Sequence, residues 1–214
     1  MPALNHSTPI VMGSMCAGSV RCYAAMVAAG QVIIDPGETH LPLRHSHHRY
    51  AIVGPNGVQQ LTVPLTGSTH NMATPMDQVL ISEHGDWRHL HWGALYSAYG
   101  RTPYFDYIAD ELHALLVDSG QTSLLQLNLS IHRLVVDFMD LPVSTTVSHD
   151  VPAGAVDLRG RICGKRPDSL PLAEVPYYQL WADRHGFRPG LSILDLLMNT
   201  GREGIFTLMH MAQG

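Results

Sequence analysis

The chain has 214 residues, of which 45% are hydrophobic and 14% are charged, so it can bury a sizeable core and intrinsic disorder is not expected. A net charge of −5 argues against a nucleic-acid-binding protein, because such a surface needs clustered positive charge. Three scattered cysteines exclude a disulfide framework and favour a cytoplasmic location. We expect neither a signal peptide nor a membrane span.

The N-terminal part predicts a β-α-β unit. Residues 9–15 are a buried strand, residues 20–29 an Ala-rich helix that Gly30 ends, and residues 31–35 a second strand. This order predicts a parallel pair with a right-handed crossover. Residues 16–19 then follow a strand's carboxyl end, where α/β folds place ligands.

A hairpin follows, because residues 49–53 and 58–63 flank the turn sequence Gly54-Pro-Asn-Gly57. Residues 78–82 predict a further strand, and we expect these strands to form a mixed sheet. Helical spacing continues over residues 86–99, 103–117 and 123–139.

The helix over residues 86–99 carries two of the three tryptophans. Its spacing predicts an inward stripe and, beside it, an aromatic flank of Trp92, Tyr96 and Tyr99. The inward stripe consists of Trp87, His91, Leu95 and Ala98.

Three regions are expected along the chain. Residues 1–149 form the α/β core, residues 150–176 are a linker or lid-like loop, and residues 177–214 are a helical segment packed on the core. Within the last region, residues 177–181 fit a strand or a helix, Ser192 caps a helix over residues 192–199, and another helix starts at residue 203.

Two interpretations of His91 stay open. It is either a core histidine whose ring nitrogens are satisfied by backbone or water, or a neutral imidazole that acts as a general base. Cys16 likewise fits an activated thiolate or, as we favour, a buried structural cysteine.

A cluster of histidines invites a metal interpretation, since His45, His47 and His48 precede a strand and imidazole binds zinc, iron or copper. On a helix, however, His89 and His91 point about 200° apart, and neither has a glutamate three residues before it, as the Glu-x-x-His motif needs. We therefore predict no bound metal, and the sequence identifies no cofactor.

Short motifs follow one another along nearly the whole chain. The first part holds His48-Arg49-x-x-Ile52, Asn56-Gly57 and Leu61-Thr-Val-Pro64. The centre holds Trp87-x3-His91-Trp92-x6-Tyr99-Gly-x-x-Pro103-Tyr-Phe105. The last part holds Tyr178-Gln179-x5-Gly186-Phe187-x4-Ser192-Ile193-x-Asp195-Leu-Leu-x-Asn199-x-Gly201. In order and spacing, these motifs resemble the WbqC-like proteins, a small bacterial family named after a gene of O-antigen clusters.

The resemblance implies a role in modifying surface polysaccharide or related sugars, without a specific reaction. The family's aromatic signature after the first strand appears here as Cys16-Ala-Gly18-Ser19, and its Asn-Arg pair appears as His48-Arg49. His45 and His47 lie outside the family pattern.

We predict a single α/β domain with a mixed β-sheet, a β-α-β start, a central hairpin and several following helices. The leading hypothesis is a transferase with a small-molecule or sugar-linked substrate, in which Arg49 and Arg101 bind an anionic donor and His91 takes a proton from an attacking amine or hydroxyl. The predicted catalytic residues are His91 and Tyr99, and the predicted substrate-binding residues are His48, Arg49, Trp87, Trp92, Arg101, Gln179 and Asp195.

Two other interpretations compete with the transferase. In the first, the chain is a non-catalytic module that binds a glycan or a protein through its aromatic surface. In the second, Trp87, Tyr99 and Asp195 have no function beyond packing and capping helices. The sequence points to no oligomeric state.

Overall fold

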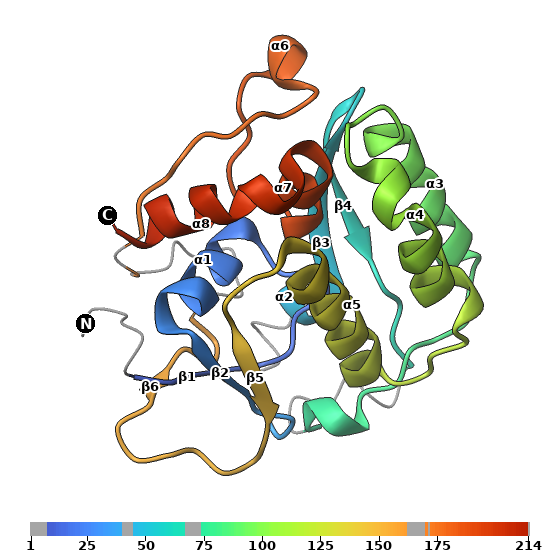
Figure 1. Cartoon of the computed structure of the whole chain (residues 1–214). Coiled ribbons are helices and arrows are strands. Elements are labelled where there is room, and N and C mark those ends of the chain that lie inside the picture. Colours follow the sequence, from blue (N-terminus) through green and yellow to red (C-terminus); the bar gives the residue numbers. More distant parts are fainter. Residues whose placement is uncertain (1–7, 40–44, 67–73, 162–169, 171, 214) are drawn as a thin grey trace.

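The computed structural model describes residues 8–39, 45–66, 74–161, 170 and 172–213, without the side chains of residues 45 and 46. It confirms the α/β fold (Figure 1). The strands are β1 (Ile10–Met12), β2 (Gln31–Ile34), β3 (Arg49–Gly54), β4 (Gly57–Thr62), β5 (Ser144–Val147) and β6 (Val156–Asp157). The helices are α1 (Val20–Ala29), α2 (His45–His48), α3 (Trp87–Tyr99), α4 (Phe105–His113), α5 (Leu124–Met139), α6 (Ala182–His185), α7 (Ile193–Thr200) and α8 (Gly204–Ala212). Shorter helical turns are η3 (Met76–Gln78), η4 (Ala114–Asp118) and η5 (Gly201–Glu203).

The parallel sheet has the strand order β5-β2-β1-β6. The predicted parallel pairing of the first two strands is confirmed, with Ile10 opposite Val32 and Met12 opposite Ile34. Both strands are apolar runs buried over nearly their whole length, as expected for strands with a parallel neighbour on each side. After β5 the chain crosses to the other side of β1 and forms β6 there.

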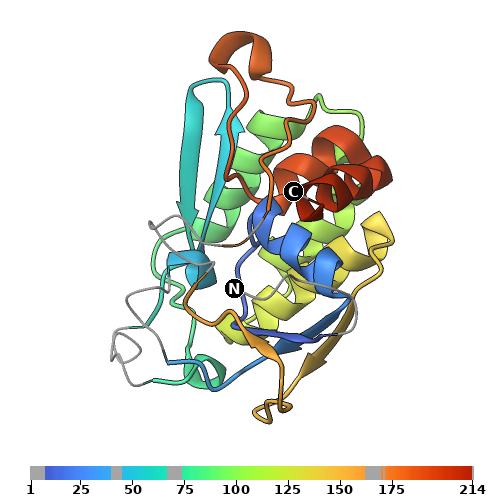
Figure 2. The same cartoon turned by 90° about the vertical axis from the view of Figure 1, so that its left-hand side faces the viewer.

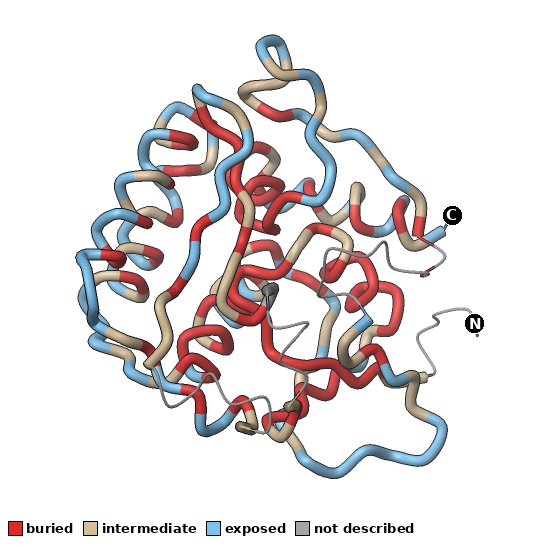
Figure 3. Tube along the Cα trace, turned by 180° about the vertical axis from the view of Figure 1, so that it is seen from behind, coloured by how far each residue is buried: buried red, intermediate tan, exposed pale blue. Residues whose placement is uncertain are grey.

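Helix α1 forms the predicted crossover. The Ser19 hydroxyl accepts a hydrogen bond from the Cys22 backbone N–H at 3.3 Å, and Gly30 ends the helix in the left-handed conformation, with φ of 69°. Its small side chains let α7 and α8 pack closely against it (Figure 2). Buried residues from β1 to α8 belong to one hydrophobic core, whereas the outer faces of α3 and α4 are exposed (Figure 3).

The predicted hairpin is confirmed, with Arg49 opposite Thr62 and Gly57 at a φ of 100° in the turn. It forms a sheet of its own, so the parallel and antiparallel strands of the described chain lie in two sheets rather than in one mixed sheet. The other edge of β3 is occupied by the C-terminal segment, since the Ser192 backbone N–H donates to the Ala51 carbonyl at 2.9 Å.

The predicted strand over residues 78–82 is wrong. Pro75 starts the short turn η3, and the residues after it make only single bridges, Leu65 to Ile81 and Leu80 to Ser123. The partners of this segment are a loop and a helix cap, and neither offers the extended edge that a strand needs. Residues 177–181 also differ from expectation, because they form neither strand nor helix.

The loop-like stretch of residues 150–176 contributes the edge strand β6 to the parallel sheet. Its lid role stays a prediction, and residues 162–169 and 171 lie outside the description. Within the described residues, no helix has the length and apolar character needed to cross a bilayer.

Helix α3 has the predicted bounds, but neither of its ends is capped in the usual way. The Asp86 side chain accepts from His89 Nδ1 at 2.6 Å instead of capping the backbone, and Gly100 is right-handed, with φ of −59°. The next helical stretch starts two residues after Pro103 and ends in the π-turn η4. There the Leu116 carbonyl accepts from the buried Arg88 guanidinium at 2.9 Å.

Ser192 makes more contacts than an ordinary N-cap. Its hydroxyl accepts from the Leu194 N–H at 3.2 Å and donates to the Ala17 carbonyl at 2.8 Å.

Ser192→Ala should therefore lower the free energy of unfolding by about 2 kcal/mol in urea denaturation. Ser123→Ala is the matched control, because its hydroxyl only caps α5, and it should cost about 0.5–1 kcal/mol. Equal losses of unfolding free energy in the two variants would show that the hydrogen bond to Ala17 does not stabilise the protein.

Candidate functional site

His91 lies in the interior, between the hairpin and α3. Its ring is 4% exposed and makes edge contacts with Trp87 and Tyr50. Nε2 is 3.1 Å from the Thr62 carbonyl oxygen, and Nδ1 is 3.2 Å from the Tyr50 hydroxyl. A carbonyl only accepts, so Nε2 carries the hydrogen and Nδ1 accepts from Tyr50.

These contacts are those of a core histidine. Burial lowers the pKa of His91 to about 4, against the smaller opposing effect of its hydrogen bond to Thr62. The imidazole is therefore neutral at pH 7, and both of its nitrogens already have protein partners. Its surroundings give no support to the general-base role predicted for it.

Tyr99 belongs to a second buried cluster, built around the Asp195 carboxylate. Oδ1 accepts from the Tyr99 hydroxyl at 2.8 Å, while Oδ2 accepts from the Tyr177 hydroxyl at 2.7 Å and from Gln179 Nε2 at 3.0 Å. The Tyr99 oxygen also accepts from the Val53 N–H at 3.3 Å. Of the predicted site residues, the structure thus brings Tyr99, Gln179 and Asp195 together.

The chemistry of this cluster favours a structural role. Burial raises the pKa of Asp195, and the hydrogen bonds from Tyr177, Tyr99 and Gln179 counteract that effect. Burial also raises the pKa of Tyr99 well above its usual range. Three donors satisfy a carboxylate that has no exposed surface, so the cluster fastens the C-terminal segment to α3 and the hairpin.

The remaining predicted residues do not form one cluster. Arg49 starts β3, whereas Arg101 follows α3 near the other end of that strand and stacks on Trp181 at 5.7 Å. Six strand residues span roughly 17 Å, so the two arginines cannot clamp one small anionic group. Trp92 packs on Phe105 and His113, and His48 is half-buried at the end of α2.

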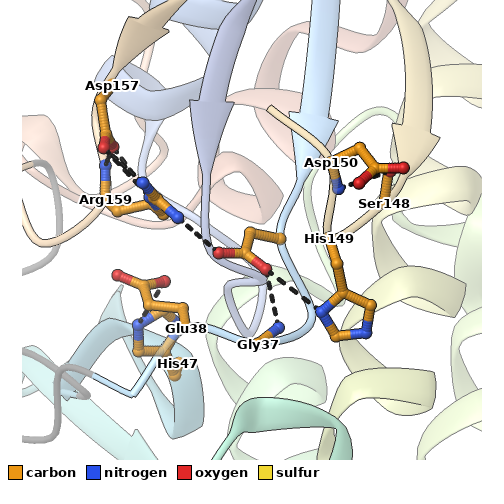
Figure 4. A network of polar contacts seen from close by, with 9 residues as sticks. Gly37, Glu38, His47, Ser148, His149, Asp150, Asp157 and Arg159 are labelled. Carbon is orange, nitrogen blue, oxygen red and sulfur yellow. Dashed lines mark hydrogen bonds and ion pairs between the residues drawn. The ribbon is translucent and has the colours of Figure 1, made fainter. Parts of the chain in front are cut away.

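Polar side chains instead meet at the carboxyl edge of the parallel sheet. Ser14 follows β1, Asp35 follows β2, His149 follows β5, and β6 is followed by Arg159. Figure 4 shows Arg159 and His149 on opposite sides of this edge, with Glu38 and His47 beside them. We call these residues, together with Asp77 and Asp157, the edge network.

Asp35 is the centre of the edge network. Its Oδ2 accepts from Arg159 at 2.7 Å, and its Oδ1 accepts from the Gly37 N–H at 2.8 Å and lies 3.8 Å from His149 Nδ1. The Arg159 guanidinium also donates hydrogen bonds of 2.6 to 3.2 Å to both carboxylate oxygens of Asp157. The guanidinium lowers the pKa of Asp157, and the hydrogen bonds that Arg159 donates to Asp157 and Asp35 raise its own pKa.

Glu38 and His47 form the buried part of the edge network. Glu38 is 4% exposed and His47 is completely buried, with 3.4 Å between Glu38 Oε2 and His47 Nε2. A Cβ on Gly13, at the end of β1, would overlap the Glu38 carboxylate. Glycine is thus needed at residue 13 so that the carboxylate can approach the backbone.

The edge network lies where an α/β sheet binds its ligands. Successive connections run from β1 to β2 to β5 in one direction, and β6 then pairs with the opposite side of β1. In doubly wound folds, ligands bind at such a change of direction, outside the carboxyl ends of the strands on either side. Gly13, Asp157 and Arg159 lie at that position.

The turn before α1 is hydrogen-bonded to the C-terminal segment. The Val20 N–H donates to the Leu191 carbonyl at 3.0 Å, and the Gly18 carbonyl accepts from the Ile193 N–H at 2.8 Å. The Val20 amide, one of the groups at a helix start that could bind a phosphate, is therefore used within the protein. Cys16 is buried there, and burial raises its pKa to about 12, which fits the structural interpretation.

Among the described residues, no three His, Cys, Asp or Glu side chains are grouped so as to hold a metal ion. The side chain of His45 lies outside the description. His47 contacts Glu38 and the Ser14 carbonyl.

Sequence reasoning missed most of the edge network. Asp35 had a signal, since an acid at the end of a buried apolar strand is typical of a parallel sheet's carboxyl edge. Asp157 and Arg159 had none, because β6 is only two residues long and its neighbour β1 is far away in the sequence.

The sequence model of the WbqC-like protein family matches residues 34–166. The chain is also similar to the uncharacterized protein Rv1507c of Mycobacterium tuberculosis (strain ATCC 25618 / H37Rv), at 24% identity over 86% of this chain and 90% of that protein. No solved structure matches the chain. The family match includes Asp35, Glu38, His47 and Arg159, whereas Asp195 lies beyond it.

Acid should destabilise the protein between pH 6.5 and 4. His91 and the buried His132, which contacts Tyr23 and Thr145, both have a pKa lowered to about 4 by burial. As the pH falls, both histidines take up a proton in the unfolded chain before they do so in the folded protein. Their full contribution to the free energy of unfolding is therefore present above pH 6.5, and about 3 kcal/mol is lost for each histidine as the pH drops to 4.

Urea denaturation of His91→Asn at pH 7 and pH 4.5 checks this expectation. Between pH 7 and pH 4.5, the free energy of unfolding of this variant should fall by about 2–3 kcal/mol less than that of the unchanged protein. His89→Asn changes an exposed histidine, so its free energy of unfolding should fall as much as that of the unchanged protein. A variant that keeps both its stability and its acid sensitivity but loses ligand binding would return His91 to the functional site.

Tyr99→Phe should lower the free energy of unfolding by about 1–3 kcal/mol, because Asp195 loses one of its donors without access to water. Tyr96→Phe is the matched control on the same helix, since its ring is 62% exposed, and it should stay within about 0.5 kcal/mol of the unchanged protein. Chemical denaturation measures both variants, and equal stabilities would contradict the structural role of Tyr99.

Proposed function

The chain belongs to the WbqC-like protein family, and we propose that it is a transferase that acts on a sugar or a surface-polysaccharide precursor at the carboxyl edge of its parallel sheet. One observation carries this proposal. Side chains at the ends of β2, β5 and β6 converge there, with Asp35 held between Arg159 and His149, and Gly13 after β1 leaves room for Glu38. Convergent polar groups at this edge are the usual basis of a ligand site in α/β folds.

The edge network suits a substrate rich in hydroxyl or amino groups. Asp35, Asp77 and Asp157 offer carboxylate oxygens, which accept hydrogen bonds from sugar hydroxyls or amines. Arg159 is held by two carboxylates at once, so its position is fixed before a substrate binds. Preorganised groups of this kind lose little entropy on binding.

The predicted binding residues contribute to this proposal to different degrees. His48 and Arg49 follow His47 directly in the chain, so they are the predicted residues nearest in sequence to the edge network. Arg49 remains our candidate for an anionic donor group, because its guanidinium can bind phosphate or carboxylate with two hydrogen bonds. Arg101 stacks on Trp181 and belongs to another part of the molecule.

A non-catalytic glycan-binding or protein-binding module is the second candidate. It rests on exposed apolar side chains of the hairpin and α3, including Val58, Leu90 and Tyr96 at 54%, 68% and 62% exposure. An open groove of about 600 Å³ lies between hairpin residues 54–59 and α3. Aromatic and small apolar surfaces of this kind suit sugars and protein partners alike.

NMR titration with a panel of amino sugars, uronic acids and nucleotide sugars separates the two candidates. A transferase substrate should shift the backbone signals of residues 35–38 and 157–159. Arg159→Met should weaken its binding at least ~10-fold, since it removes the group that orders Asp35 and Asp157. Arg184→Met, an exposed arginine of α6, should bind as the unchanged protein does.

The opposite pattern would favour the binding module. NMR signal shifts confined to residues 54–59 and α3, with equal ligand affinity in both arginine variants, would show that the ligand does not bind at the sheet edge. The groove between the hairpin and α3 would then be the binding surface.

A further inference from the structure

His149 is the exposed imidazole of the edge network. It follows β5, and its side chain is 66% exposed, so a ligand at the carboxyl edge of the sheet can touch it. Its two ring nitrogens face different carboxylates, with 3.8 Å from Nδ1 to Asp35 Oδ1 and 3.8 Å from Nε2 to Asp77 Oδ2. The ring therefore lies between two acids that come from separate segments of the chain.

The backbone around Gly37 holds these groups in place (Figure 4). The Gly37 N–H donates to Asp35 Oδ1 at 2.8 Å, and the Pro36 carbonyl accepts from the Asp77 N–H at 2.9 Å. A Cβ on Gly37 would lie 3.0 Å from His149 Nδ1 and 3.2 Å from Asp35 Oδ1, which is closer than an ordinary van der Waals contact. Glycine at residue 37 thus leaves the space in which the ring approaches the buried carboxylate.

The two carboxylates differ in their access to water, and this difference decides where a neutral ring carries its hydrogen. The Asp35 side chain is 8% exposed and that of Asp77 is 35% exposed, so water screens the charge of Asp35 less. Arg159 binds Oδ2 of Asp35, so Oδ1 is the oxygen that faces the ring. A hydrogen on Nδ1 is therefore favoured, and Nε2 keeps a lone pair. The distances of 3.8 Å exceed a hydrogen bond, but such contacts in ligand-free sites commonly shorten when a substrate binds.

We propose that His149 is the general base of the edge network and that the acceptor group it deprotonates is a primary amine. This inference rests on the proposed transferase function. An amine nitrogen has two hydrogens, so it can donate one to His149 Nε2 and one to Asp77 Oδ2, whereas a hydroxyl has a single hydrogen for two acceptors. The two acceptor atoms are 3.8 Å apart, so one nitrogen can lie about 2.9 Å from both. Its lone pair then points away from them, toward the group to be transferred.

The transfer step balances with an anionic donor of the kind that the proposed transferase uses. As the amine nitrogen bonds to the transferred group, one of its two protons passes to His149 Nε2. The bond between the transferred group and the leaving group breaks, and the leaving group departs with the electron pair. The imidazolium, stabilised by Asp35 and Asp77, then returns the proton to the leaving group or to water. Asp35 is a positioning residue, because it orients the ring without touching the amine.

Two-bond ¹H–¹⁵N correlation spectra of the full chain without ligand test the base. At pH 9, far above the usual pKa of an imidazole, His149 should carry a hydrogen on Nδ1 and none on Nε2. Asp35→Asn should move this hydrogen to Nε2, which faces Asp77. Asp150→Asn, at the next position in the chain, is the control and should leave the His149 signals unchanged.

A hydrogen on Nε2 of the unchanged protein, alone or together with one on Nδ1, would overturn the base role. If Asp35→Asn does not fold, Gly37→Ala is a second route, because its Cβ pushes the ring away from Asp35 and should also move the hydrogen toward Nε2. A His149 tautomer that neither variant alters would likewise contradict the orienting role of Asp35.

NMR titration with glucosamine and glucose tests the amine, since these sugars differ only in an amino group against a hydroxyl. Glucosamine should bind at least ~10-fold more tightly and shift the Nε2 signal of His149. Asp77→Asn should remove most of this preference. Asp118→Asn is the matched control, because it removes an acid paired with His113 at 3.0 Å on another part of the surface, and it should keep the preference.

The outcomes separate this inference from the proposed function. Equal affinity for the two sugars, with both shifting the signals of residues 35–38, would refute the amine acceptor and leave the transferase proposal standing. If neither sugar binds, the proposed sugar ligands fail, and the ligand-free spectra still decide whether His149 can act as the base.

Discussion

Parallel pairing of four short strands is the constraint on which the candidate site depends. Parallel strands end at the same edge, so residues far apart in the sequence are brought into one row. These strands are only two to four residues long, and backbone hydrogen bonds alone hold such a sheet weakly. Arg159 strengthens the edge by joining Asp35 to Asp157, across a sequence distance of 124 residues for the first of these contacts. The charged groups that form the site are also groups that hold it together.

Three buried polar clusters differ in how their polar atoms are satisfied and in where they lie. His91 has one donor and one acceptor, so the neutral ring is fully satisfied. Asp195 has three donors for one carboxylate, and no proton has to move to satisfy it. Glu38 and His47 differ in their place, because their side chains meet at 3.4 Å next to the carboxyl ends of β1 and β2, at the edge where α/β sheets bind ligands.

The sequence predicted what depends on local patterning. Apolar runs and caps gave α1, β2 and the hairpin to within one residue, whereas β1 is three residues shorter at its C-terminal end than predicted. Ser192 was correctly identified as the cap of α7. The inward stripe was also right, since Trp87, His91, Leu95 and Ala98 are all buried. Periodicity could not separate Tyr99 from the exposed flank, because its burial depends on a hydrogen bond to Asp195, 96 residues later. Arg159 carried no signal, because its contact with Asp35 is fixed only by the strand order.

The C-terminal segment connects the Asp195 cluster to the sheet edge by direct contacts. Asp195 lies in the first turn of α7, whose cap Ser192 donates to the Ala17 carbonyl, and Ala17 is held at a φ of 43°, which is unusual for a residue other than glycine. This turn begins at Ser14, whose carbonyl accepts from His47. A segment that lies beyond the family match thus holds in place the backbone on which the Glu38–His47 pair depends. Residues with no part in the chemistry can therefore be as necessary to the site as those that form it.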